Sequence, residues 1–443
     1  MDAWNEIPKH PGQKSLPAER SKANSVRYQI RAIGEISVIA WFSDAGFLPR
    51  YGFPINLQRL SVRVPKNTVE DKSTTSEKYR LERQSLIALS EYVPGAELLV
   101  GGKVLESRGI LKHWTDSNRD EALGLNYWAL KCANQHEYLA TSQSGICPEC
   151  DEGPAEQGQM LMFPRFGYTT AAWAPPKSPG RRLDRIGEVV VVALDGIARG
   201  DATKRIEDFA DIGGLIASYF EAGRGQLLYR NAGDGNGGQE GFGFAVCTRC
   251  GFAMSETAPP DRRGIARQLP GKFREHPSIF SSKETFRCWS RDEEPVLRNR
   301  VLAARETTDM LFLHWDRSFD ASAGYSLGRA LVLAGTQLLE LDSRELEMDI
   351  KSQNTQGTSI LLYDATPGGS GHCLELMNLG VKWILKARAI LRGSAKHHSV
   401  CRKACLECLL DFSGQFHADR LDRRKALDFL EGSLGPGGDL ASH

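Results

Sequence analysis

Three pairs of cysteines share the spacing Cys-x2-Cys, which is typical of metal-binding knuckles. In chain order they are Cys147 with Cys150, Cys247 with Cys250, and Cys405 with Cys408. The short gap lets a tight turn direct both thiolates toward one ion, and a tetrahedral zinc site then needs two further ligands. A saturated set of protein ligands predicts structural rather than catalytic zinc, which keeps a position open for water. Buried reduced thiols, or a thioredoxin-type redox motif, are the alternatives.

The remaining ligands can be assigned by proximity along the chain. Ten cysteines and two histidines supply twelve ligands, enough for three four-coordinate sites. At the third site His397, His398 and His417 compete with Cys373. Mixed Cys and His sites favour zinc over an iron–sulfur cluster. The predicted ligands are Cys132, His136, Cys147 and Cys150; Cys247, Cys250, His276 and Cys288; and Cys373, Cys401, Cys405 and Cys408.

A glycine turn and a basic segment near the C-terminus predict a surface for DNA. The turn consists of Gly368, Gly369, Ser370 and Gly371, between a strand pattern and a helix pattern. Backbone N–H groups at a helix N-terminus can bind a phosphate, although such glycines can also serve only a tight turn. The basic segment contains no acidic residue and can also be a solvated helix face. Its cations are Lys382, Lys386, Arg388, Arg392, Lys396, Arg402 and Lys403.

Overall composition limits where such a surface can lie. The 443 residues include 56 Lys or Arg and 55 Asp or Glu, so the net charge is +1. A protein that is basic throughout is excluded, and a nucleic-acid surface must be local. The sequence has no run of 18 apolar residues, and the polar N-terminus has no signal-peptide core, so we expect a cytoplasmic protein without membrane partners.

The sequence periodicity predicts an α+β protein built from several parts. Small β modules and zinc ribbons precede a C-terminal α/β zinc-binding domain. We expect helices at 26–46, 86–95, 211–223, 323–342 and 373–393, a hairpin at 96–110, and strands at 187–196, 308–316 and 359–366. The predicted parts are a flexible arm (1–25), a helix with a small β module (26–115), a first zinc ribbon (116–175), a β-rich region with the second zinc site (176–295) and the C-terminal domain (296–443).

Several stretches together resemble a known family. LLYDATPGGSGHCLEL (361–376), the basic helix and CRKACLECLLDFSGQFHADRLDRRKAL (401–427) resemble the C-terminal zinc-binding domain of MrfA-type DNA helicases. The DISARM antiphage subunit DrmB carries a similar domain. Further stretches resemble the helicase tail in the same order, so the likeness spans roughly residues 35 to 430; they are 47–54, 90–110, 229–251, 307–313 and 338–347.

The resemblance implies a partner with a motor. In these helicases two RecA-like domains precede the matched region, whereas this sequence has no Walker A motif and no DEAH box. We therefore expect a non-catalytic, zinc-stabilised, DNA-binding accessory subunit that works with a separate DEAD/DEAH-type helicase in antiphage defence. The family's third zinc cluster has four cysteines, and Ser399 stands at the first of these positions, which leaves the fourth ligand open.

Two other functions remain open from the sequence. A metal-dependent nuclease could use Asp364 with His372, or the set Glu345, Glu347, Asp349 and Lys351, whose side chains share one face only on a strand. A protein-binding scaffold could dock through the helix expected at 26–46. The sequence favours the accessory subunit over both.

Overall fold

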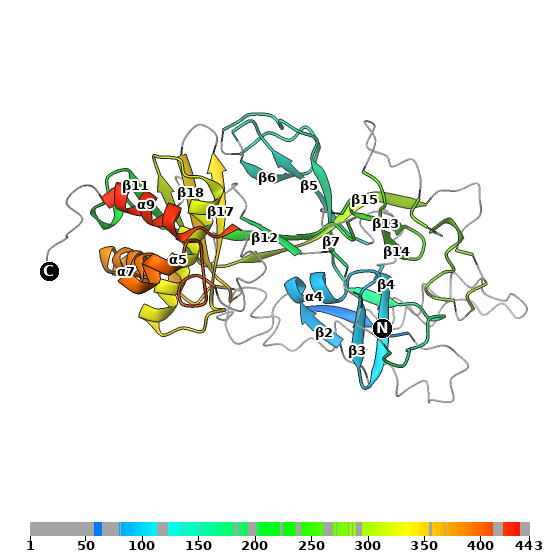
Figure 1. Ribbon diagram of the computed structural model, residues 1–443. Helices are drawn as coiled ribbons and strands as arrows, with labels where there is room; N and C mark the ends of the chain where they lie inside the picture. Colours follow the sequence, from blue (N-terminus) through cyan, green and yellow to red (C-terminus); the bar gives the residue numbers. More distant parts are fainter. Residues whose placement is uncertain are drawn as a thin grey trace, which may run out of the picture.

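The computed structural model combines three β-sheets with a C-terminal group of helices (Figure 1). Its described residues include strands and helices throughout, so the predicted α+β class is confirmed. The helix predicted at 26–46, the arm 1–25 and His417 lie outside these residues. The structure describes residues 57–63, 79, 81–112, 123–134, 136–148, 150–180, 184, 186–187, 189–193, 202–221, 225–235, 241–259, 269–271, 273–281, 283–285, 287–288, 295–353, 357–366, 368–410 and 420–434.

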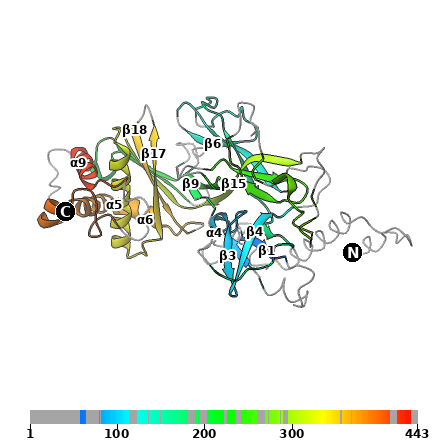
Figure 2. The same cartoon turned by 45° about the vertical axis from the view of Figure 1, so that its right-hand side comes forward.

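The C-terminal part is an antiparallel sheet covered by helices. Its order is β10-β11-β16-β18-β17, and every neighbouring pair is antiparallel. Helix α5 (Ala321–Leu339) lies against this sheet and carries α7 (Val381–Arg392) and α9 (Arg423–Leu434) on its outer side (Figures 1 and 2). The strands are β10 (Lys204–Ile206), β11 (Leu215–Phe220), β16 (Met310–Trp315), β17 (Leu346–Gln353) and β18 (Gly357–Asp364).

The helices begin and end where the sequence provides caps and glycines. Asp320 caps α5 by accepting a hydrogen bond from the Ala323 N–H at 2.7 Å. The helix predicted as one unit at 373–393 is two, because Gly380 adopts φ 52° and ψ −127° between them. The indole N–H of Trp383 donates to the Leu331 carbonyl at 2.9 Å and joins α7 to α5. The helices are α5 (Ala321–Leu339), α6 (His372–Leu379), α7 (Val381–Arg392), α8 (Ala395–Val400) and α9 (Arg423–Leu434).

The segment 211–223 was predicted to be a helix, and this prediction is wrong. Leu215–Phe220 form β11, which pairs with β10 on one side and β16 on the other. The burial of β11 alternates along the strand, but its less buried face still carries the apolar Ile216. The sequence therefore shows little alternation of apolar and polar residues and imitates a helical pattern.

The largest sheet has eight strands and contributes the loops of two cysteine and histidine groups, around Cys132 and Cys247. Its main order is β14-β13-β15-β7-β5-β6, with β12 beside β15 and β9 beside β12. The long β15 pairs with both β13 and β12. The strands are β5 (Gly124–Lys131), β6 (Glu137–Ala140), β7 (Gln159–Pro164), β9 (Val189–Ala193), β12 (Gln226–Asn231), β13 (Phe244–Cys247), β14 (Ala253–Ser255) and β15 (Val296–Thr307).

A second five-stranded sheet packs beside it, in the order β2-β1-β8-β4-β3. Helix α4 (Ser85–Glu91) lies next to β15 and β12 and buries Ala88 and Leu89. The predicted hairpin at 96–110 is present as β3 and β4. The strands are β1 (Leu57–Ser61), β2 (Leu81–Gln84), β3 (Glu97–Val100), β4 (Lys103–Ile110) and β8 (Tyr168–Thr170).

Strand pairing crosses the predicted domain boundary near residue 296. Strands β10 and β11 belong to the C-terminal sheet, while β15 belongs to the eight-stranded sheet. Strand pairing alone does not define which segments form separate parts, so the predicted division stays a prediction. Among the helices of the described residues, none is long and apolar enough to cross a membrane.

Candidate metal centres and nucleic-acid interface

Three groups of four side chains gather their ligand atoms into tetrads. In each tetrad the three sulfurs and one imidazole nitrogen lie within 4.8 Å of one another. Around one zinc ion, ideal tetrahedral geometry places two sulfurs ~3.8 Å apart and a sulfur and a nitrogen ~3.6 Å apart. Among the described residues these tetrads are the groups of three or more Cys, His, Asp or Glu that could hold a metal.

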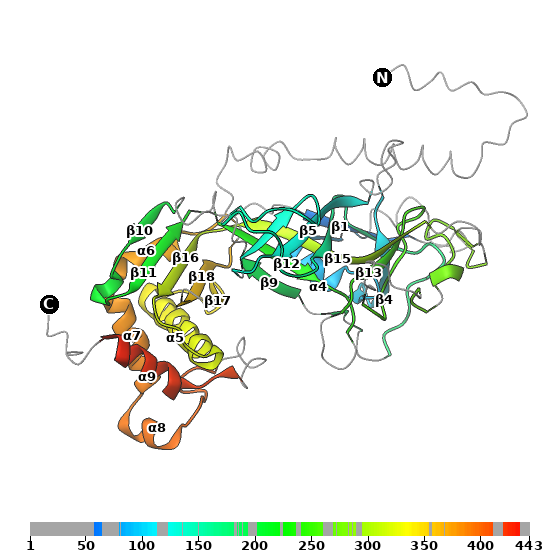
Figure 3. The same ribbon diagram turned by 90° about the horizontal axis from the view of Figure 1, so that it is seen from above.

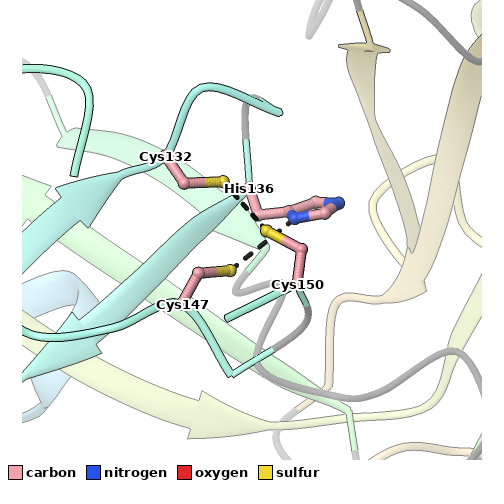
Figure 4. Close-up of side chains that lie close together, drawn as sticks. All are labelled: Cys132, His136, Cys147 and Cys150. Atoms are coloured by element: carbon pink, nitrogen blue, oxygen red, sulfur yellow. Dashed lines mark hydrogen bonds between the residues drawn. The ribbon is translucent and has the colours of Figure 1, made fainter. Parts of the chain in front are cut away.

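The first tetrad joins a hairpin turn to a knuckle (Figure 4). Cys132 follows β5 and His136 precedes β6, and the Cys132 N–H donates to the His136 carbonyl at 3.2 Å. The knuckle contributes Cys147 and Cys150. The Cys132 and Cys150 sulfurs lie 3.7 Å apart, and the Cys147 sulfur lies 3.6 Å from His136 Nδ1. These separations fit zinc, and all four predicted side chains come together.

The second tetrad lies at the end of β13. The sulfurs of Cys247 and Cys288 are 3.9 Å apart, and the sulfur of Cys250 lies 3.4 Å from His276 Nε2. The other ring nitrogen, Nδ1, lies 2.6 Å from the Phe273 carbonyl. An N–H at Nδ1 leaves Nε2 free to bind a metal, and this arrangement fixes the orientation of metal-bound histidines in general. The four predicted side chains come together here as well.

The imidazole of His276 is held from a second side. Its ring stacks on Phe252 with centroids 4.4 Å apart and planes inclined by 6°. The N–H of Phe252 points at the Cys250 sulfur, 3.4 Å away. Such N–H···S contacts stabilise the thiolate form that binds zinc.

The third tetrad corrects the predicted ligand set. It consists of His397, Cys401, Cys405 and Cys408, with His397 in place of Cys373. His397 Nε2 lies 3.2 Å from the Cys405 sulfur, and the Cys408 sulfur lies 3.9 Å from the sulfurs of both Cys401 and Cys405. His397 and Cys401 are four residues apart at the end of α8, which places them on one side of that helix.

Cys373 lies in the core between the sheet and the helices instead. It is fully buried, and its sulfur lies 3.6 Å from the Leu362 carbonyl. Burial and the nearby Asp364 carboxylate raise the pKa of the Cys373 thiol. The side chain is thus a neutral core thiol, and the predicted role as a zinc ligand is wrong.

A buried arginine that the sequence analysis missed supports the third tetrad. Arg423 is fully buried in α9, and its guanidinium donates to the carbonyls of Cys401 at 2.6 Å and Leu391 at 2.6 Å. It also donates to the His398 carbonyl at 3.3 Å. One sequence signal was available, because Arg423 shares a helical stripe with buried residues three, four and seven positions later; these are Ala426, Leu427 and Leu430.

The glycine turn does not present free N–H groups, which corrects the predicted phosphate site. The N–H of Ser370 donates to Asp364 at 2.7 Å, and the N–H of Gly371 donates to Asp309 at 2.8 Å. Gly368 and Gly369 donate to the Thr307 and Thr366 carbonyls. Buried carboxylates and carbonyls of the chain itself therefore take the positions that a phosphate needs.

One nuclease residue predicted at this turn, Asp364, accepts hydrogen bonds from the backbone of the turn itself. Asp364 is buried, and besides Ser370 it accepts the N–H groups of His372 and Cys373 at 3.1 Å each. Burial raises the pKa of Asp364 despite these hydrogen bonds. Backbone N–H groups at the start of α6 thus take three of the about four acceptor positions of this carboxylate, which is the role of a helix cap.

The second predicted carboxylate set lies at β17. Glu347 and Asp349 are two residues apart on this strand, which places them on one face. Glu345 precedes the strand and accepts the Asp342 N–H at 3.0 Å. The side chain of Lys351 lies outside the described residues. None of these carboxylates joins a metal-binding group among the residues that the structure describes.

The basic segment forms an exposed face on α7 and on the segment that carries the third tetrad, residues 395–408, which we call the third knuckle. Trp383, Ile384, Ala387 and Leu391 bury one side of α7. Lys382 and Arg392 are exposed on the other side, with Lys386 half-buried beside them. Arg388 departs from the prediction, because its guanidinium pairs with Glu431 of α9 at 3.3 Å.

The knuckle itself projects from the helices beyond α7 and α9 (Figure 3). Its cations Lys396, Arg402 and Lys403 are exposed. The apolar side chains of Val400 and Leu406 are also exposed, by 76% and 84%. The contact of any of these residues with DNA remains a prediction.

Comparison with known proteins supports the predicted resemblance. The family model of the MrfA Zn-binding domain matches residues 327–409, which run from α5 to the third tetrad. The predicted resemblance to the MrfA-type zinc-binding domain is confirmed by this match. Together with the three tetrads, it supports structural zinc.

Two longer similarities extend beyond this region. The Druantia protein DruE of Escherichia coli (strain UMEA 4076-1) is 26% identical over 420 residues, covering 88% of this chain and 21% of DruE. The chain thus spans about a fifth of the length of that relative. A crystal structure of the DUF1998 helicase MrfA bound to DNA is 11% identical, covers 79% of this chain and 31% of the helicase chain, and has a TM-score of 0.34.

Proposed function

We propose that this chain is a non-catalytic, zinc-stabilised DNA-binding module that works with a DEAD/DEAH-type helicase motor on a separate polypeptide. The match to the MrfA Zn-binding domain over 327–409 supports the association with a helicase. The similarity to the Druantia protein DruE supports a role in antiphage defence. Membership of a DISARM system, which the resemblance to DrmB implies, stays a prediction.

The exposed basic face of α7 and the third knuckle carries the DNA-binding part of the proposal. Lys382, Lys386 and Arg392 lie on the side of α7 opposite its buried residues. The third tetrad fixes the adjoining knuckle, which adds Lys396, Arg402 and Lys403. Zinc supplies no reaction here, because four protein ligands saturate it. We propose that these cations contact phosphates, which carry no sequence information, so we expect weak sequence preference and strong salt dependence.

A matched pair of variants tests the basic face. In the first variant, Lys382→Ala, Lys386→Ala and Arg392→Ala remove three cations from α7. In the control, Lys204→Ala, Arg205→Ala and Arg344→Ala remove three exposed cations elsewhere, with the same change in net charge. The slope of log affinity against log salt should fall by about 2 to 3 in the first variant only. Equal slopes in both variants would contradict DNA binding by this face.

The helicase part requires the native assembly. The tagged chain is purified from its own cells with and without nuclease, and proteins and metals are quantified. A near-stoichiometric helicase and about three zinc ions per chain support the proposal. A chain recovered without a helicase would contradict the partner.

The exposed Val400 and Leu406 favour one second candidate, a scaffold that contacts a protein through the third knuckle. Single exposed apolar side chains are common, but these two lie six residues apart on one knuckle and are the most exposed large apolar side chains of the described residues. A helicase that stays bound after nuclease treatment, with no DNA binding by the purified complex, would favour the scaffold over the DNA-binding module.

A further inference from the structure

A pocket lies where the second five-stranded sheet meets the eight-stranded sheet, and none of its lining residues belongs to a zinc tetrad. Its volume is about 280 Å³, and β1, α4, β5, β7 and β15 contribute to its wall. Figure 1 shows α4 below β7 and β12 at this junction. Junctions between packed units are common positions for ligand sites, and this volume lies just below the range of roughly 300–1,000 Å³ for ligand pockets, as suits a ligand of one small unit.

The wall of the pocket is tied together by hydrogen bonds between distant segments. Gln58 of β1 donates through its side-chain N–H to the carbonyl of Pro164 at the end of β7, at 3.0 Å. The side chain of Asn231 in β12 donates to the carbonyl of Leu89 in α4 at 2.8 Å. These bonds hold the sheets and the helix in place before any ligand arrives, which lowers the entropic cost of binding.

The charge of the lining is entirely positive. Arg165 and Arg305 are both exposed at its edge, and none of the residues that line the pocket is acidic. The guanidinium carbon of Arg305 lies 5.4 Å from the ring centroids of both Tyr127 and Phe163. These rings restrict the Arg305 side chain to the edge of the pocket, where it can meet an anion.

An apolar surface adjoins these two cations. Phe163 lines the pocket and packs edge-to-face on Tyr127, with ring centroids 5.7 Å apart and planes inclined by 84°. Leu125, also in the lining, is 38% exposed. A flat apolar group can therefore lie against Phe163 and Leu125 while an attached anion reaches Arg165 and Arg305.

We propose that this pocket binds one nucleotide unit of a single-stranded nucleic acid. The base lies against Phe163 and Leu125, and the phosphate contacts Arg165 and Arg305. A base that is stacked and paired in a duplex exposes no face to such a pocket, whereas an unstacked base does. The inference deepens the proposed function, on which it rests, and adds a second contact remote from the basic face of α7.

A paired-variant experiment tests the pocket. The full-length chain is titrated with a fluorescent ten-residue deoxythymidine oligonucleotide. Arg165→Ala with Arg305→Ala should weaken binding by about tenfold, because two charge-assisted contacts to the phosphates are lost. Arg205→Ala with Arg344→Ala removes the same charge elsewhere and should change affinity by less than about twofold. All four arginines are exposed, so neither variant disturbs the core.

Cross-linking locates the bound strand independently of affinity. An oligonucleotide with 5-iododeoxyuridine is irradiated on the native chain, and cross-linked peptides are identified by mass spectrometry. We expect cross-links at Tyr127 or Phe163. A wild-type chain that binds the oligonucleotide, with full affinity in the Arg165/Arg305 variant and cross-links only within 381–408, would overturn the pocket and leave the proposed function intact.

Two further outcomes would contradict the proposed function or the identity of the ligand. A wild-type chain that binds no oligonucleotide at any salt concentration would overturn the proposed function together with the pocket. In a competition experiment, thymidine monophosphate is added at the same nucleotide concentration as the oligonucleotide. If the monophosphate displaces the oligonucleotide from the cross-linked site, the ligand is a free nucleotide and not a single strand. Weak competition by the monophosphate supports the strand, because neighbouring phosphates then contribute to binding.

Discussion

The guanidinium of Arg423 donates to the carbonyl of Cys401 through two nitrogens, at 3.0 and 2.6 Å. One residue of α9 thus holds a ligand of the third tetrad, although 22 positions separate the two in sequence. Arg423 also bonds to Leu391 at the end of α7. The arginine is fully buried and charged, and backbone carbonyls satisfy it in place of a carboxylate. The knuckle and the basic helix are therefore fixed to one another through this side chain.

Arg423→Met should destabilise the C-terminal part by about 3 kcal/mol, because the carbonyls of Cys401 and Leu391 lose their buried donors. Zinc should also leave the third tetrad faster in the presence of a chelator. Urea unfolding and chelator-driven zinc release measure the two effects. Lys425→Met, on the exposed side of the same helix, is the control; it removes only a surface ion pair to Asp320 and should unfold and release zinc much as the wild type does. Equal stability of both variants would show that Arg423 has no such role.

The third tetrad makes a second prediction about metal content. His397→Ala should lower bound zinc from about three to about two ions per chain, since three cysteines alone leave the ion open to water and chelators. Cys373→Ala should retain all three ions, because Cys373 lies in the core. Mass spectrometry of the metals in both purified variants measures this difference. Loss of one ion from Cys373→Ala, with none lost from His397→Ala, would restore the ligand set predicted from the sequence.

Some ligands of the zinc sites follow from local sequence spacing, and others depend on contacts between distant segments. The pairs such as Cys247 and Cys250 depend on a turn of two residues, and spacing alone predicts them. The fourth ligand of the third tetrad depends on α8, whose last turn brings His397 next to Cys401. Cys373 lies near the other ligands in sequence, but it is buried in α6 against the sheet. Long-range packing determines whether His397 or Cys373 is the fourth ligand, and the spacing of residues along the chain does not encode that packing.

The same limit applies to the fold. The hairpin at 96–110 and the helix α5 follow local patterns, and both were predicted. Leu215–Phe220 were mistaken for a helix, because the buried strand β11 takes apolar residues on both faces. The phosphate site at the glycine turn failed for a related reason. The carboxylate of Asp309, which blocks it, arrives from a strand connection some sixty residues earlier in the chain.

Asp364→Asn tests whether the glycine turn is a structural element. The amide keeps one acceptor oxygen and places an NH2 group against the N–H donors of residues such as Ser370 and Cys373. We expect a loss of about 1 to 3 kcal/mol in the free energy of unfolding, with the affinity of the folded protein for DNA unchanged. Magnesium-dependent DNA cleavage by the wild type that disappears in this variant would contradict the assignment and support a nuclease.

Glu306 on β15 predicts how stability changes with pH. It is 6% exposed, and burial raises its pKa from 4.5 to about 7. The folded state therefore holds its proton more tightly than the unfolded state, so this carboxyl stabilises the fold at low pH. That contribution is lost as the pH rises from 4.5 through about 7, and it is on the order of 3 kcal/mol.

Glu306→Gln removes this titration and keeps the shape of the side chain. The wild type should lose stability relative to the variant as the pH rises from 5 through about 7, and the difference should become constant only above about pH 8. Urea unfolding of both proteins, at matched free zinc and at pH values from 5 to 8.5, measures the difference. Because both proteins share the zinc sites, proton competition at the cysteines cancels in the comparison. A difference that does not change with pH would show that Glu306 keeps an ordinary pKa in the fold.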